Sequence, residues 1–332
     1  GGAIYESGSS LDILRSVFQS NTAGDSNSGF AGDGGAIFSD SSTMINESLF
    51  DGNSAKEGDG VPGDGGSIFH DGTLNIIDTT VENSSAGRGG GLYGTINGVA
   101  TISGTTLANN NADGSGTAGG AIGGAGTLEI RNSTLSGNIA SGNSSNGGGI
   151  GLFSGSAYLN NVALAFNSAT GLGGPLYAEF GDFGAFISFS NTLFSGNTGG
   201  GTDCNTVASL GHNLFENAPC PILASDIVSD PLIEFLDSNG GPTQTHALQN
   251  QSPAINSGYP VPNFLGFDTG NFTQLQTQGG ASLDADTLLL ADSTTFVGSA
   301  FVTNPIDPAQ DFSATFQFRI TPGIDGAADG IT

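Results

Sequence analysis

A double glycine, followed by one residue of any type and then an aliphatic one, recurs seven times in the first two thirds of the chain. The copies begin at Gly1, Gly34, Gly65, Gly89, Gly119, Gly147 and Gly173. Self-similarity of this kind is typical of repeat architectures, in which each unit buries its apolar face only against its neighbours. The repeat therefore constrains the fold more than any other feature of the sequence.

Each copy continues with two alternating apolar residues and then a third apolar position. The alternating pairs are Leu11/Ile13, Thr43/Ile45, Leu74/Ile76, Ala100/Ile102, Leu128/Ile130, Ala157/Leu159 and Ile187/Phe189. Alternation predicts strands with one buried face. Three short strands in a repeat of roughly 24 to 33 residues must pair with neighbouring repeats, which predicts an all-β parallel solenoid. The alternative is a propeller, which needs about four strands and ~40 residues per blade.

An asparagine follows the third apolar position by three residues in six of the seven copies, and Ser84 takes this place in the other. The six are Asn21, Asn53, Asn110, Asn138, Asn167 and Asn197. Asparagines at one corner predict a ladder, in which each side-chain amide bonds to the next coil. The alternative is that each is an ordinary turn former.

The charge balance excludes several partners. Only 5 Lys and Arg stand against 31 Asp and Glu, giving a formal net charge of −26. Phosphate contacts need a basic footprint, so nucleic acid and anionic membranes are excluded as partners. No apolar run reaches the ~18 residues of a membrane helix. The opening at Gly1 lies inside a repeat, so we expect a fragment or a processed product.

Insertions between the ladder position and the next double glycine gather acidic residues at one edge. Hard oxygen ligands among Gly, Ser and Asn are typical of calcium sites, so calcium is the expected cofactor. The alternative is a solvated acidic edge that maintains solubility. The candidate ligands are Asp25, Asp33, Asp59 and Asp64.

Cys204 and Cys220 are the only cysteines of the chain. An even count in an acidic, Lys-poor sequence favours a disulfide in an oxidising compartment over a metal pair. Two buried free thiols are the alternative.

The repeats, together with four later motifs, resemble a known group of proteins. The motifs are Ser209-Leu210-Gly211-His212-Asn213-Leu214, Ser229-Asp230-Pro231-Leu232, Asp237-Ser238-Asn239-Gly240-Gly241-Pro242-Thr243-Gln244-Thr245-His246-Ala247-Leu248 and Ser252-Pro253-Ala254-Ile255-Asn256-Ser257-Gly258. They are similar to the choice-of-anchor Q region of bacterial surface proteins in the pectin-lyase-like superfamily. The resemblance implies a right-handed parallel β-helix over residues 1–200 and further coils and a cap over residues 201–259. It also implies secretion, a cell-surface location and a pair of cysteines in this region. On physical grounds, residues 201–259 would close the solenoid end.

A different pattern follows a predicted linker at residues 260–270. Residues 271–332 resemble the opening strands of an L-type, legume-like lectin, which implies a short antiparallel β segment like a truncated jelly roll. In that family an Ala-Asp pair before glycine commonly carries a sugar-binding aspartate, which corresponds here to Asp329. The metal loop and the other sugar-contacting loops of such a lectin are not in this chain.

An enzyme is the alternative function, because many β-helix proteins degrade polysaccharides. A lyase needs a cationic base beside calcium, but Arg15, Lys56, Arg88 and Arg131 are scattered along the repeats. A hydrolase needs two carboxylates on neighbouring coils, and Asp51 and Glu82 occupy matching positions. Two solvated surface acids are the simpler interpretation of that pair. His70, His212 and His246 are interpreted as structural.

Taken together, the sequence predicts an extracellular structural or adhesive protein of the bacterial cell surface. We expect a stalk or fibre subunit that binds glycans or associates with itself, because the open first coil allows end-to-end assembly. We expect no catalysis, no nucleic-acid binding and no membrane insertion.

Overall fold

The structure is a computed structural model that describes residues 1–24, 32–56, 63–180, 184–201, 205–217, 222–255 and 257–258, and four strands within residues 275–302. The chain divides into two compact units, residues 1–259 and residues 260–332. The described residues form strands and turns without any helix, so none of them makes a helix long and apolar enough to cross a bilayer. The all-β prediction is confirmed.

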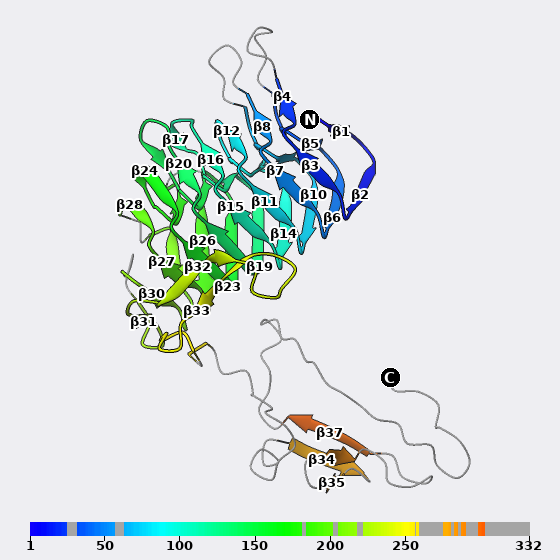
Figure 1. The fold of residues 1–332 in the computed structure, drawn as a ribbon, viewed down its shortest axis with the longest axis vertical. Coiled ribbons are helices and arrows are strands. Elements are labelled where there is room, and N and C mark those ends of the chain that lie inside the picture. Colours follow the sequence, from blue (N-terminus) through cyan, green and yellow to red (C-terminus); the bar gives the residue numbers. More distant parts are fainter. Residues whose placement is uncertain are drawn as a thin grey trace, which may run out of the picture. The chain divides into compact units, whose positions relative to one another are not determined.

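The first unit is a parallel β-solenoid, in which the strands that follow the double glycines stack as one seven-stranded sheet, sheet A (Figure 1). Neighbouring strands pair parallel and in register, as in Ile4↔Ile37 and Ile37↔Ile68. We number coils 1 to 7 by these strands. They are β1 (Ile4–Glu6), β5 (Ile37–Ser39), β9 (Ile68–His70), β13 (Leu92–Gly94), β18 (Ile122–Gly124), β22 (Ile150–Leu152) and β25 (Leu176–Ala178).

The second and third strands of each coil belong to one large sheet, sheet B. The second strands are β2 (Ser10–Leu14), β6 (Ser42–Asn46), β10 (Thr73–Ile77), β14 (Val99–Ser103), β26 (Phe186–Ser190) and β29 (Val207–Ser209). The third strands are β3 (Val17–Gln19), β7 (Leu49–Asp51), β11 (Thr80–Glu82), β15 (Thr106–Ala108), β27 (Leu193–Ser195), β30 (Leu214–Phe215) and β31 (Ile227–Val228). In coils 5 and 6 both strands merge into β19 (Thr127–Ser136) and β23 (Ser156–Ala165).

A fourth short strand follows the ladder position in every coil, and the sequence analysis missed it. These strands form sheet C: β4 (Thr22–Ala23), β8 (Ser54–Ala55), β12 (Ser85–Ala86), β16 (Asn111–Ala112), β20 (Ile139–Ala140), β24 (Ser168–Leu172) and β28 (Thr198–Gly200). Two insertions also stack on each other through β17 (Gly116–Thr117) and β21 (Ser145–Asn146). Most of these strands have two residues, too few for a period to be recognised.

The core is the column of apolar side chains inside the coils. Ile45, Phe50, Ile76 and Leu107 are wholly buried, with 0% exposure. Full burial of an aliphatic or aromatic side chain contributes about 1.5–3 kcal/mol relative to exposure. The repeated apolar positions therefore stabilise each coil against the next.

Residues with positive φ form the two corners on either side of the third strand. Asn132 (φ 49°) precedes Ser133 at one corner, and Asn109 (φ 55°) precedes Asn110 at the other. The same left-handed conformation recurs at equivalent positions, which Gly and Asn adopt at the lowest cost. These corners hold the following residue of every coil in the same place.

The C-terminal part of the first unit continues sheet B and then forms a hairpin. Strands β29, β30 and β31 extend sheet B past coil 7, and an antiparallel hairpin follows, β32 (Ile233–Asp237) and β33 (Thr245–Leu248). This hairpin lies on the flank of the solenoid against β19 (Figure 1). The second unit contains two antiparallel pairs, β34 (Leu275–Gly279) with β37 (Gly298–Val302) and β35 (Ser282–Asp284) with β36 (Thr287–Leu289).

Candidate functional site

The six predicted asparagines form a ladder along the corner after the third strand. Asn110 donates through its backbone N–H and its Nδ2 to Asn138 Oδ1, both at 3.0 Å, and Nδ2 also donates to the carbonyl of Val81 at 3.0 Å. Asn138 bonds to Asn167 in the same way. Asn110, Asn138 and Asn167 are wholly buried. Each amide thus satisfies turn groups of the adjoining coils.

Ser84 interrupts this ladder, and a second serine bridges the gap. The Asn53 Nδ2 donates to Ser67 Oγ at 3.2 Å, and Ser67 Oγ lies 2.8 Å from Ser84 Oγ. Ser67 follows the double glycine of coil 3, where other copies have Ala, Gly or Pro. The two hydroxyls together fill the place of one asparagine side chain.

A second ladder, made of hydroxyl groups, runs along the corner before the third strand. Ser48 Oγ accepts the Ser16 N–H at 3.0 Å and donates to the carbonyl of Asn46 at 2.8 Å. The hydroxyl of Thr79 plays the same part for Ser48. Sequence reasoning missed this ladder, although in six of the seven coils a Ser or Thr stands five residues before the asparagine-ladder position of the same coil. The members are Ser16, Ser48, Thr79, Thr105, Ser133 and Thr192, and Val162 breaks the series.

Two of the four predicted calcium ligands lie in the described part of the insertion edge. Asp33 Oδ1 accepts the backbone N–H of Asp64 at 3.1 Å. The Asp64 carboxylate is bound at both oxygens by Arg88, at 2.8 and 2.6 Å, and Arg88 also lies 5.0 Å from the Tyr93 ring centroid. A cation of the chain therefore occupies this carboxylate. Asp25 and Asp59 lie outside the described residues, which contain no cluster of three or more His, Cys, Asp or Glu suited to a metal.

Burial dominates the electrostatics of this edge. It raises the pKa of Asp64 to about 6 despite the guanidinium, and it raises the pKa of Asp33 as well. A further cation near Asp33 and Asp64 would stabilise their ionised forms, because burial disfavours the charge of both carboxylates. Calcium binding at this edge stays a prediction.

Asp51 and Glu82 lie side by side on β7 and β11, as the register predicts. Parallel strands are ~4.8 Å apart, so the two carboxylates face the same patch of solvent. Asp51 accepts from Gln19 Nε2 at 2.9 Å and from Asn83 Nδ2 at 2.8 Å. Burial, and next the charge of Asp51, raises the pKa of Glu82. Of this pair, Glu82 therefore binds its proton more tightly than a free carboxyl group.

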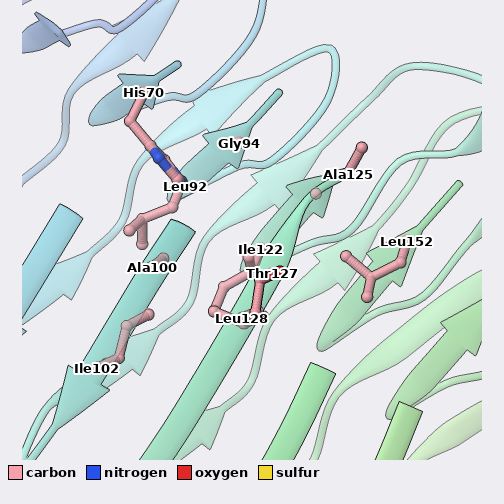
Figure 2. A pocket seen from close by; sticks show the side chains of 11 residues that line it. His70, Leu92, Gly94, Ala100, Ile102, Ile122, Ala125, Thr127, Leu128 and Leu152 are labelled. Atoms are coloured by element: carbon pink, nitrogen blue, oxygen red, sulfur yellow. The ribbon is translucent and has the colours of Figure 1, made fainter. Parts of the chain in front are cut away.

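His70 lies inside the solenoid and lines a small cavity with Leu92, Gly94 and Ile122. Figure 2 shows its ring extending from β9 toward Leu92, among the apolar side chains of the following coils. Its Nδ1 lies 3.2 Å from the carbonyl of Gly72, and burial lowers its pKa. Most of the other lining residues are apolar, so the cavity is a gap in the core packing beside the ring.

The hairpin β32–β33 brings His246 onto the flank of the solenoid. His246 Nδ1 lies 2.8 Å from the carbonyl of Glu234, which makes Nδ1 the donor, and Nε2 lies 2.9 Å from Ser136 Oγ. Its ring meets Phe166 edge-on, with centroids 5.6 Å apart. His212 has a left-handed backbone, φ 59°, at the corner of a terminal coil.

Three other predicted site residues, Cys204, Cys220 and Asp329, lie outside the described residues. The disulfide and the sugar ligand remain predictions. Comparison with protein-family models, with curated proteins and with solved structures gave no match.

Proposed function

We propose that this chain is an extracellular structural or adhesive surface protein, a β-helix stalk or fibre subunit that presents a glycan-binding, lectin-like segment. The single observation that carries the proposal is the use of polar side chains for stacking. Two ladders follow both corners of the third strand, and their members bind the neighbouring coil rather than a common pocket. Such an arrangement gives a rigid, extended scaffold.

Charge and location support the same proposal. The net charge of −26 keeps an exposed scaffold soluble and repels anionic surfaces. The resemblance to anchored surface proteins adds the bacterial cell surface as the place of action. Calcium, if it binds at the acidic edge, would act by neutralising part of this charge.

The test is retention of the chain on insoluble polysaccharides, neutral and acidic, with calcium and with chelator. We expect retention on at least one neutral polysaccharide and loss of retention in Asp329→Asn. The matched control is Asp237→Asn, which removes one carboxylate from the exposed hairpin. Retention that is equal in all three chains would contradict a glycan site at Asp329, and retention on none would leave self-association as the adhesive function.

A polysaccharide-degrading enzyme is the second candidate, and one observation favours it. Asp51 and Glu82 are stacked carboxyls, and the pKa of Glu82 is raised by burial and by the charge of Asp51, as a general acid of a glycosidase requires. The cavity beside His70 does not include either residue of this pair. Cleavage that is lost in Asp51→Asn and Glu82→Gln would establish this function.

A further inference from the structure

The side chains of the hairpin β32–β33 are less buried than those of the solenoid surface that it covers. Between residues 233 and 248 no side chain is buried, and Phe235 is 86% exposed. The outward-facing residues of the solenoid beneath it are nevertheless buried, with Thr106 at 0% and Ser136 at 5% exposure. A segment that contributes no buried side chain of its own is weakly held compared with the core coils.

The attachment of the hairpin consists of a few polar contacts with residues more than a hundred positions away. Thr243 Oγ1 donates to the carbonyl of Gly104 at 2.8 Å, and Thr106 Oγ1 donates to the carbonyl of Gln244 at 2.5 Å. The third contact is that of His246 with Ser136. The hairpin's own ladder pairs only β32 with β33, so these contacts can break without disturbing a solenoid strand.

Phe166 of the solenoid holds the hairpin through an aromatic contact with His246, although its own backbone lies in the unfavourable left-handed region. It occupies the corner before Asn167 with φ 57°, where other coils have Ser, Asn or Gly. A bulky residue in the left-handed region is strained. Gly196, one coil on, leaves the space for the ring, because a Cβ there would lie 2.4 Å from Phe166 Cδ1. The ring in turn contacts His246.

The hinge of the hairpin is strained as well. Leu232, immediately before β32, has φ 50°, and Pro231 precedes it. A strained residue at the entry of a segment stores conformational energy that opening releases. Strained residues therefore stand both at the entry of the hairpin and at the solenoid corner that His246 of the hairpin contacts.

We infer that the hairpin β32–β33 is a strap that opens as one unit while the solenoid beneath it stays folded, with Phe166 and His246 as its clasp. Closed, it covers the flank of sheet B from β15 to β19. Open, it makes that flank continuous with the row formed by the exposed Gln19 and the half-buried Asp51 and Glu82. The inference is independent of the proposed function.

The experiment is amide hydrogen exchange on the full chain and on Phe166→Asn. Asparagine suits the left-handed corner, so this variant relieves strain while it removes the clasp. We expect the amides of β32 and β33 to exchange together and faster than those of β15 in the parent chain. In Phe166→Asn we expect hairpin exchange to rise about tenfold, with exchange of β15 unchanged or slower.

Two further variants separate the clasp from general effects. Ser20→Asn makes a comparable change at the same corner of coil 1 and is expected to leave hairpin exchange unchanged. His246→Ala removes the other half of the clasp and is expected to match Phe166→Asn. The inference is overturned if hairpin and β15 exchange at one common rate in the parent chain. It is equally overturned if Phe166→Asn leaves the hairpin rate unchanged or raises both rates together.

Discussion

The hydroxyls of Ser67 and Ser84 lie 2.8 Å apart and together replace the side chain that the asparagine ladder lacks in coil 3. Both residues are buried, at 0% and 1% exposure. We expect Ser67→Ala and Ser84→Ala each to lower the free energy of unfolding by about 1–2 kcal/mol, because each leaves a buried polar partner unsatisfied. Chemical denaturation of the double variant should show a loss smaller than the sum. Strict additivity would show that the two hydroxyls act independently.

The hydroxyl ladder predicts that replacing Thr by Val at one of its positions destabilises the protein more than replacing Val by Thr at the position where the ladder is broken. Thr79→Val removes the acceptor of the Ser48 N–H and should cost about 1–2 kcal/mol, since the site is wholly buried. Val162→Thr inserts a hydroxyl at the break in the series and should cost less than half as much. Thermal unfolding of both variants measures the difference. Equal destabilisation would mean that the ladder does not contribute to stability.

Gly94 is required by the ring of His70. A Cβ on Gly94 would lie 2.7 Å from His70 Nε2, closer than atoms pack. Gly94→Ala should therefore cost about 1–3 kcal/mol by overpacking. In a His70→Ser background, which copies Ser39 of coil 2, the same change should cost much less. If Gly94→Ala lowers the free energy of unfolding by the same amount in that background, the added methyl group does not clash with His70.

The Arg88–Asp64 pair makes stability depend on pH in a definite direction. Asp64 has a folded pKa of about 6, raised from 3.8, so its ionisation disfavours the folded state as pH rises through this window. Arg88→Gln removes the partner and raises that pKa further. We expect a loss of about 2 kcal/mol at pH 7, which reflects the partial exposure of Arg88, and a much smaller loss at pH 5. The matched control is Arg15→Gln on the exposed Arg15–Glu47 pair, which should change stability little at either pH.

His246 makes the closure of the hairpin pH-dependent. Partial burial of the half-buried ring lowers its pKa, so the docked hairpin favours the neutral ring and loosens as pH falls below the value of about 6.5 for a free histidine. The ring contacts Glu234 only through its carbonyl, and Ser136 and Phe166 carry no charge. Limited proteolysis of the hairpin should therefore accelerate between pH 7.5 and pH 5.5. The acceleration should be absent in His246→Phe; if it persists there, another group titrates.

The solenoid could be predicted from the sequence because its determinants are local and repeated. The double glycines, the alternating pairs and Asn110, Asn138 and Asn167 each recur in register. Sheet C was missed because a two-residue strand has no readable period. The position of the hairpin was missed for another reason: Thr243 and Gly104 are 139 residues apart, and no local pattern records such a contact.

The sites were less predictable than the fold. Asp64 is an acidic residue in a glycine-rich insertion, as a calcium ligand would be, but its carboxylate is bound by Arg88 from the next coil. That partner is visible only once the coils are stacked, because 24 residues separate the two. The hydroxyl ladder, in contrast, had a local signal in the constant spacing of Ser48 to Asn53 and Thr105 to Asn110.

The central claim is that the polar side chains of this chain serve stacking and surface presentation rather than catalysis. The most direct test is the chain-length distribution of acidic and neutral polysaccharides after incubation with the protein, with and without calcium. The account predicts unchanged polymer length with the parent chain and with an Asp51→Asn/Glu82→Gln double variant. Polymer that is shortened by the parent chain and left intact by the double variant would contradict the claim and establish a polysaccharide-degrading enzyme.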